Sequence, residues 1–341
     1  MEAPVTTGQD GGAAWVLGVD SGGSGLRIAL ARATADGVAP AAGERRTDEP
    51  VRTGPGGIDA GHLLAQLLPA ARALLDGAAP AARIDAVCVG AAGMATLGGR
   101  LRAELPQALA AGLGARRLAL AADAVTGYAG ALGETPGAVA AAGTGMIALG
   151  TELRGWRRAD GWGHLLGDCG GGAWIGRRGL EAALREHDGR PGGSAALLAR
   201  AEAAFGPMAG LPGQLYPRAD RPAVLASFAP EVARCAAGPE PDPVAAGILA
   251  EAAAEIAGTL AAVCPPGEAG RIALTGGLFR LGEPLTGPLA GELARRLPGV
   301  EVVEAAGGPL EGALLIAGRL AFGACRLPAD PGLLHLVDDR G

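Results

Sequence analysis

The sequence predicts an α/β protein made of two α/β units. Apolar runs of strand length alternate with helical patterns over most of the 341 residues. A strand, a turn of small residues and a second strand follow one another twice, at 15–31 and again at 137–149. A chain of this length can bury two cores, because one compact domain usually holds about 100–150 residues.

The first unit is expected at 14–121, after a flexible N-terminal tail at 1–13. Residues 15–19 and 26–31 read as two strands of a hairpin. The elements expected next are a helix with apolar residues at helical spacing, a strand, a second helix and a further strand, at 58–75, 84–89, 101–109 and 117–121.

The second unit is expected at 122–325, followed by a C-terminal tail at 326–341. Its elements are a hairpin, two helices, a strand and a last helix, at 137–149, 171–186, 244–263, 271–275 and 310–322. The alternative that the last helix packs back on the first unit stays open. One glycine-rich turn in each unit predicts a cleft in which both turns face one nucleotide.

Composition and charge narrow the classes of function. All 29 basic residues are arginine, which excludes the lysine-dependent phosphate loops and Schiff-base chemistry. A net charge of −6 gives no support to nucleic-acid binding. The five scattered cysteines indicate neither a disulfide framework nor a zinc site, so a reduced, cytoplasmic setting is expected. No apolar run reaches about 18 residues, so no membrane segment is expected.

The first turn combines a carboxylate with small residues. Asp20 ends the first apolar strand and is followed by Ser21, Gly22, Gly23 and Ser24. Glycine lets backbone amides approach a phosphate closely, and a single carboxylate suits the Mg²⁺ that accompanies it. The competing interpretation is a tight hairpin that carries a surface aspartate.

Four motifs in order carry a family resemblance. The Asp20 turn, Gly143-Thr144-Gly145 and Thr275-Gly276-Gly277 resemble the two phosphate motifs and the adenosine motif of the actin-like ATPase and sugar-kinase superfamily. The segment from Gly161 to Asp168, with Gly170 and 174–176 after it, looks like the signature of the N-acetylglucosamine kinases. These kinases are grouped with the activator ATPases of 2-hydroxyacyl-CoA dehydratases.

The resemblance covers residues 15–323 and implies two actin-like, ribonuclease H-like α/β domains with an ATP cleft between them. It implies that Asp20 holds Mg²⁺ through water and that Ser21–Ser24 contact the β- and γ-phosphates of ATP. It also implies that 143–145 contact phosphate, with the Thr144 hydroxyl near phosphate or sugar. Residues 275–277 would then lie against the adenine and ribose.

Two aspartates are the candidates for the sugar side. Asp123 matches the residue that accepts the proton of the attacking sugar hydroxyl in related kinases, and its structural alternative is a helix N-cap. Asp168, with Gly161, would bind sugar hydroxyls, and its alternative is a solvated or helix-capping aspartate. Trp162 and His164 are expected to be packing residues. Cys169 near a helix start could have a lowered thiol pKa, although an inert thiol is the simpler expectation.

The chain departs from the family pattern more at positions expected to determine the sugar than at those expected to bind ATP. The first turn continues with Gly25 where relatives have a basic residue. Cys169 and Gly171 stand in place of a glutamate and a serine, and an asparagine expected near 52–53 has no clear counterpart.

The resulting prediction is a cytoplasmic, homodimeric kinase that uses ATP and Mg²⁺ to phosphorylate an amino sugar, with Asp123 as base. N-acetylglucosamine is the expected acceptor and N-acetylglucosamine 6-phosphate the product. N-acetylmuramic acid, glucosamine and glucose are alternative acceptors. Two alternatives of another class are a regulatory or activator ATPase that acts on a protein partner and a nucleotide sensor without turnover.

Overall fold

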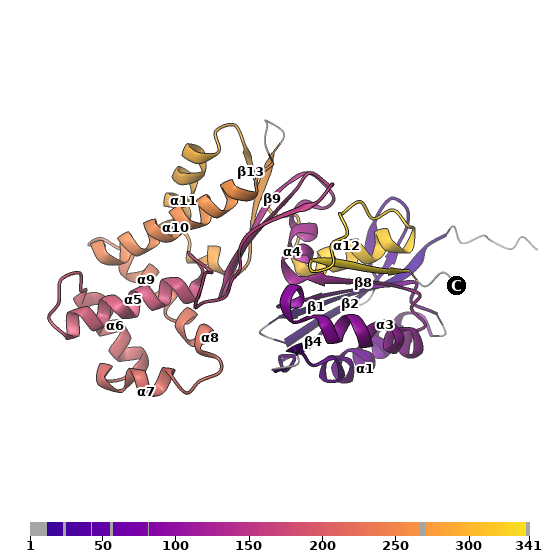
Figure 1. Ribbon diagram of the computed structural model, residues 1–341, viewed down its shortest axis with the longest axis horizontal. Helices are drawn as coiled ribbons and strands as arrows, with labels where there is room; N and C mark the ends of the chain where they lie inside the picture. Colours follow the sequence, from indigo (N-terminus) through magenta and orange to yellow (C-terminus); the bar gives the residue numbers. More distant parts are fainter. Residues whose placement is uncertain are drawn as a thin grey trace, which may run out of the picture. The chain divides into compact units, whose positions relative to one another are not determined.

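The computed structural model describes residues 12–22, 25–41, 43–54, 57–80, 82–265 and 270–338. The chain divides into two compact units, coloured along the sequence in Figure 1. Among the described residues, unit 1 holds those up to Glu134, Leu153–Gly155 and those from Ala306 onward. Unit 2 holds Thr135–Glu152 and Trp156–Ala305.

Unit 1 is built on a mixed sheet whose strands follow the order β14-β8-β7-β1-β2-β3, with β4 also paired to β2. The hairpin is β1 (Ala14–Gly22) with β2 (Gly25–Ala33), as the sequence predicts. The strands β7 (Ala86–Ala91) and β8 (Arg117–Ala122) run parallel to β1. The short strands of this unit are β3 (Val38–Pro40), β4 (Arg45–Thr47), β5 (Thr53–Gly54) and β6 (Gly57–Ile58).

Helices cover both faces of this sheet. In Figure 1, α1 (Ala60–Ala78) and α3 (Gly99–Leu113) lie on one side of the strands. On the other side lie α4 (Asp123–Leu132) and α12 (Pro309–Ala321). The short α2 (Met94–Leu97) precedes α3. The helices predicted at 58–75 and 101–109 are therefore confirmed, with ends a few residues away.

Helix α12 packs on β1 and α4, so it belongs to unit 1. The close approach depends on glycine: a Cβ on Gly312 would lie 1.9 Å from the Thr126 carbonyl oxygen, and one on Gly18 would lie 2.8 Å from Leu314 Cγ. Small residues let the two helices and the strand share one tight interface. By these contacts, the first unit also includes α4, beyond the boundary expected near residue 122.

The C-terminal segment is ordered where the sequence suggested a tail. Strand β14 (Leu334–Asp338) pairs antiparallel with β8, with Leu334 opposite Ala121. Leu334 is fully buried and Arg117 forms an ion pair with Asp338. The tail interpretation is wrong for these residues, because the burial of Leu334 and the pairing with the edge strand β8 outweigh the local proline and aspartate content.

Unit 2 repeats the layout in a sheet of order β11-β10-β9-β12-β13. Its hairpin is β9 (Gly137–Ala142) with β10 (Met146–Thr151), and β12 (Arg271–Thr275) runs parallel to β9. The outer strands are β11 (Trp156–Asp160) and β13 (Glu301–Val303). The predicted second hairpin and the strand at 271–275 are confirmed.

Several helices of unit 2 pack on α10. The two predicted ones are α5 (Gly172–His187) and α10 (Pro243–Val263), and the later α11 (Glu283–Arg296) packs on α10. The segment between α5 and α10, where no element is predicted from the sequence, forms α6 (Ala195–Phe205), α7 (Leu211–Leu215), α8 (Arg221–Ala226) and α9 (Ala229–Ala236). Short 3-10 turns are η1 (Met208–Gly210) and η2 (Gly277–Leu281).

Helix α10 alone among the described helices is long and apolar enough to cross a membrane. It serves instead as the central core helix of unit 2, where Ile248, Leu249, Ile256 and Leu260 are buried. A core helix passes the same test of length and composition as a membrane span, so this feature is weak evidence for a membrane.

Candidate functional site

In unit 1, Asp20 and Asp123 lie at the same edge of the sheet. The strands β1, β7 and β8 are parallel neighbours, and their register places Asp20 beside Gly90 and Gly90 beside Ala121. Asp123 follows β8 directly, at the start of α4. Because adjacent strands are about 4.8 Å apart, β1 and β8 are separated by about 10 Å. The same edge of the sheet therefore carries both aspartates, and the charge of Asp123 contributes to the raised pKa of Asp20.

Asp20 is a mostly buried carboxylate with an incomplete counter-charge. Its side chain is 16% exposed, and Arg27 Nη1 lies 3.9 Å from Asp20 Oδ2. The guanidinium is shared, because Arg27 also donates to Glu44 from Nε at 2.7 Å and from Nη2 at 3.1 Å. Burial raises the pKa of Asp20 to about 6, with Arg27 opposing the shift and Asp123 adding to it. A divalent cation nearby would favour the ionised form.

The side chain of Arg27 places a positive charge beside Asp20, although the first turn itself has no basic residue. Arg27 was not predicted from the sequence. Arg27 stands directly opposite Asp20 across the hairpin. Gly25, where the family resemblance implies a basic residue, has φ +115°, and a Cβ there would lie 1.9 Å from the Thr47 carbonyl oxygen. A side chain does not fit at residue 25, so the charge stands two residues later. The hairpin register could have identified Arg27.

The remaining residues of the first turn are partly described. Ser21 is 5% exposed and Gly22 pairs with Gly25. Gly23 and Ser24, which the sequence assigns to phosphate binding, lie outside the described residues.

Asp123 is the first residue of α4, one position inside the helix. The N-cap is Ala122, and Asp123 Oδ1 accepts a hydrogen bond from the Ala124 amide at 2.9 Å. A carboxylate in the first turn is stabilised by the helix macrodipole. The residue therefore interacts with the helix start without serving as its N-cap, and its role as a base stays a prediction.

In unit 2, the two predicted nucleotide turns lie side by side. The turn Gly143-Thr144-Gly145 follows β9 and the turn Thr275-Gly276-Gly277 ends β12, and these strands are parallel neighbours. Gly276 has φ +104°, and a Cβ there would lie 2.2 Å from the Ala142 carbonyl oxygen. Only glycine allows this approach of the two chain segments.

The start of α5 is hydrogen-bonded to the first of these turns. The amides of Gly172 and Ala173 donate to the carbonyl oxygens of Gly143 and Thr144 at 2.9 and 2.8 Å. Thr144 itself has an exposed side chain. The backbone of the turn is thus fixed while its hydroxyl remains accessible.

The predicted sugar residues gather at the same edge of unit 2. A Cβ on Gly145 would lie 2.4 Å from Asp168 Oδ2, and a Cβ on Gly161 would lie 2.7 Å from Ile147 Cδ1. Asp168 is half-buried and its Oδ1 accepts from the Gly163 amide at 3.0 Å. Burial raises the pKa of Asp168, and the Gly163 amide opposes the shift. The N-cap of α5 is Gly171, so Asp168 does not cap that helix.

Asp160 is a second residue that sequence reasoning missed. It ends β11, and its carboxylate accepts hydrogen bonds from the amides of Asp168 and Cys169 at 2.6 and 2.8 Å. No periodicity or motif marks it, because its partners follow eight and nine residues later.

The structure contradicts one side-chain expectation in this segment, that for Trp162. Trp162 is 64% exposed and stacks on the Arg158 guanidinium, so it is not a core packing residue. Burial raises the pKa of the Cys169 thiol, which agrees with the simpler expectation of an inert thiol. His164 is half-buried.

Unit 1 thus brings Asp20 together with Asp123, and unit 2 brings Thr144, Gly161 and Asp168 together with the 275–277 turn. Predictions that join residues of both units stay predictions.

Within the described ranges, no group of three or more His, Cys, Asp and Glu side chains is placed to hold a metal ion. A cation at Asp20 would therefore depend on water and ligand oxygens for most of its shell, as Mg²⁺ commonly does.

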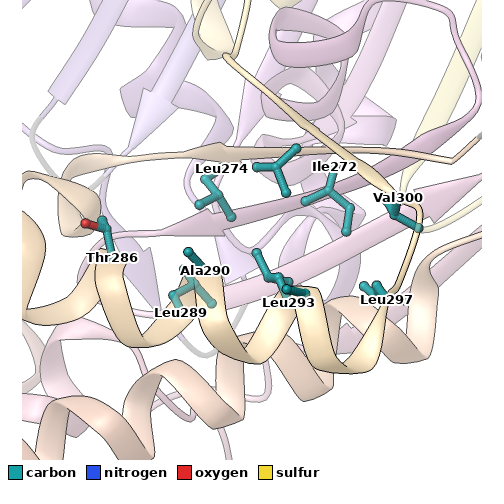
Figure 2. A pocket seen from close by; sticks show the side chains of 10 residues that line it. Ile272, Leu274, Thr286, Leu289, Ala290, Leu293, Leu297 and Val300 are labelled. Atoms are coloured by element: carbon teal, nitrogen blue, oxygen red, sulfur yellow. The ribbon is translucent and has the colours of Figure 1, made fainter.

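A cavity of about 360 Å³ lies elsewhere in unit 2. Figure 2 shows side chains of β12 and of α11 pointing toward one another across it, among them Ile272, Leu274 and Leu293. Thr286 is the one polar residue in an otherwise apolar lining. The cavity offers no group for phosphoryl chemistry.

Comparison with known proteins agrees with this architecture. Residues 17–317 match the model of the BadF/BadG/BcrA/BcrD ATPase family. A structure from Chromobacterium violaceum, described as a candidate N-acetylglucosamine kinase, is similar with a TM-score of 0.66 and 29% identity, covering 89% of this chain and 98% of the other. A Porphyromonas gingivalis protein with the same description has a TM-score of 0.65 and 18% identity, covering 88% and 97% of the two chains, which shows the fold alone.

A curated relative matches over a shorter stretch. The N-acetylmuramic acid/N-acetylglucosamine kinase of Clostridium acetobutylicum is 39% identical over 69 residues. The matched part is 20% of this chain and 22% of that protein.

Proposed function

The chain belongs to the BadF/BadG/BcrA/BcrD ATPase family, and from that premise we propose that it transfers the γ-phosphoryl group of ATP to the primary hydroxyl of an amino sugar. N-acetylglucosamine is the proposed acceptor and N-acetylglucosamine 6-phosphate the product. The similarity to proteins described as amino-sugar kinases supports this choice of acceptor.

The observation that carries the proposal is the pair of carboxylates at one edge of the unit 1 sheet. Asp20 is buried beside a shared arginine and has a raised pKa, whereas Asp123 stands at the start of a helix. Phosphoryl transfer needs charge neutralisation at the phosphates and a proton acceptor for the attacking hydroxyl. The two carboxylates are suited to these separate tasks.

The donor set around Asp20 fits Mg²⁺. A single carboxylate, completed by water and phosphate oxygens, matches the preference of this ion. Magnesium, when bound, would neutralise the charge that develops on the transferred phosphoryl oxygens. Asp20 would hold it through water, and the amides of the first turn would position the phosphates.

Asp123 would remove the proton from the sugar hydroxyl as the new oxygen–phosphorus bond forms. The bond between the γ-phosphorus and the bridging oxygen breaks, and ADP leaves with the electron pair. The proton then passes from Asp123 to solvent.

The unit 2 residues support an acceptor rich in hydroxyl groups. Asp168 is half-buried with one carboxylate oxygen bound to the Gly163 amide, so the other is available to accept from a sugar. Thr144 offers an exposed hydroxyl. Gly276 has no side chain, so the adenosine could contact the backbone at this turn.

The proposal is tested by coupled ADP release with Mg-ATP across N-acetylglucosamine, N-acetylmuramic acid, glucosamine and glucose. Release that depends on N-acetylglucosamine is expected. Stimulation by another of these sugars alone would change the acceptor, and release that no sugar stimulates would favour the activator-ATPase alternative. The homodimer and the cytoplasmic location stay predictions, the first of which a mass measurement in solution would check.

A further inference from the structure

We propose that Asp160 is a positioning residue that holds Asp168 in the conformation needed to bind the acceptor sugar. The inference rests on the proposed function, because it gives Asp168 the sugar as its ligand. It adds a residue outside the sugar motif and assigns it a role through Asp168.

The Asp160 carboxylate binds two consecutive amides at the far end of the sugar segment. Oδ1 accepts from the Asp168 amide at 2.6 Å and Oδ2 accepts from the Cys169 amide at 2.8 Å. Hydrogen bonds to an ionised acceptor are about twice as strong as neutral ones. Both oxygens of Asp160 are thus engaged on the backbone of the residue to be positioned and of its neighbour.

The Asp168 side chain accepts a hydrogen bond from the other end of the same segment. Its Oδ1 accepts from the Gly163 amide at 3.0 Å, so this bond and the two bonds to Asp160 connect the two ends of the segment in opposite directions. Gly167 must be glycine for this closure, because a Cβ there would lie 2.3 Å from Asp160 Oδ1. The links leave Asp168 Oδ2 as the oxygen directed at Gly145.

The backbone of Asp168 needs such support. Asp168 has φ +55° and Asp160 has φ +57°, a left-handed region that costs of order 1 kcal/mol for a residue with a side chain. Such conformations persist where surrounding bonds over-determine them. The bond from the Asp168 amide to Asp160 is the direct restraint on that residue.

Arg158 anchors the start of the segment. It donates from Nε to the Asp160 carbonyl oxygen at 3.1 Å and from Nη2 to the Gly161 carbonyl oxygen at 2.6 Å. Its guanidinium also lies 4.6 Å from the centroid of the Trp162 ring. These bonds from Arg158 fix the backbone of Asp160, so its carboxylate is held in place to accept from the amides of residues 168–169.

Two variants separate positioning from folding. Asp160→Ala removes both acceptors. Asp160→Asn keeps one oxygen acceptor but turns an NH₂ group toward the other amide, so it should fall between the wild type and the alanine variant. Loss of a charged hydrogen bond corresponds to a factor of about 10–100. We expect the KM for the sugar to rise by that factor in Asp160→Ala, with the KM for ATP changed less than about twofold.

The experiment combines steady-state kinetics with amide hydrogen exchange of the 161–172 region and a melting curve. Exposed Asp36 in unit 1 provides the control Asp36→Asn. The expected result is faster exchange at 168–169 together with the higher sugar KM, graded from alanine to asparagine. If the alanine variant fails to fold, the asparagine variant carries the test.

Faster exchange with an unchanged sugar KM would overturn the proposal, as would unchanged exchange. An equal rise in the KM values for sugar and ATP would also overturn it, because that is the signature of general structural damage. A wild type without any sugar-dependent turnover would contradict the proposed function, and with it the sugar-binding role given to Asp168; unchanged exchange in Asp160→Ala would separately overturn the restraint assigned to Asp160.

Discussion

The carboxylate of Asp168 packs directly against Gly145, so closely that a Cβ on Gly145 would lie 2.4 Å from Asp168 Oδ2. The contact joins the predicted sugar carboxylate to the predicted phosphate turn of unit 2. A methyl group at residue 145 therefore tests whether the two motifs act as one site.

The Gly145→Ala variant should displace the Asp168 carboxylate and raise the KM for the sugar by about 10-fold or more, because the added carbon and the oxygen cannot both keep their places. Its melting temperature should also fall. Exposed Gly247 on α10, where a Cβ meets nothing within 4 Å, provides the control Gly247→Ala. Equal melting temperatures and equal sugar KM for Gly145→Ala and the wild type would show that the contact is irrelevant.

The Asp123→Asn variant should lower kcat by about 10²- to 10⁴-fold, the usual contribution of a general base. Asparagine keeps an oxygen that can accept from the Ala124 amide, so α4 should begin as before. The measurement is sugar-dependent ADP release beside a far-ultraviolet circular dichroism spectrum. Near-normal turnover in the folded variant would remove Asp123 from this role.

The Asp20→Asn variant should lose Mg-dependent turnover yet be more stable than the wild type without metal. Burial raises the pKa of Asp20 from 3.8 to about 6, so ionised Asp20 destabilises the fold above that pH. Removing the charge should raise the free energy of unfolding by about 2 kcal/mol at pH 8 in EDTA. Urea unfolding measures this gain. Unchanged stability or retained turnover would contradict the assignment.

Sugar affinity should weaken as the pH falls, because Asp168 becomes protonated. Burial and the nearby Asp160 raise the pKa of Asp168, while the Gly163 amide, His164 and Arg158 oppose the shift. Because the folded-state pKa is raised, protonation occurs at a higher pH than for an ordinary aspartate, and the protein gains stability there as the pH falls. Calorimetric sugar titrations at several pH values should show that the wild type loses affinity as the pH falls and that Asp168→Asn does not. Identical pH profiles for the two proteins would argue against a role of Asp168 in this pH dependence.

Much of the fold could be predicted because its elements show simple periodicity. The two hairpins and the helices at 60–78, 172–187 and 243–263 follow local apolar patterns. Strand β14 could not be found this way, since its place depends on the free edge of β8. The shorter helices at 195–236 lie in a region whose order comes from packing in unit 2.

Some residues of the candidate site could likewise be predicted from the sequence, and others could not. Glycine turns after strands located Asp20, Gly143 and Gly276, and at Gly276 only glycine allows the close approach of the neighbouring segment. Arg27 was recoverable from hairpin register. Asp160 was not, because its importance depends on a left-handed backbone and on amides eight and nine residues away.

The most direct test of the central claim is the identity of the product. Purified protein is incubated with Mg-ATP and N-acetylglucosamine, and the sugar is examined by mass spectrometry and phosphorus NMR. We predict one added phosphate, located on the 6-oxygen, formed in proportion to ADP and formed about 100-fold or more slowly by Asp123→Asn. ADP that accumulates without any phosphorylated sugar, or no ADP from a folded protein that binds Mg-ATP, would contradict the account.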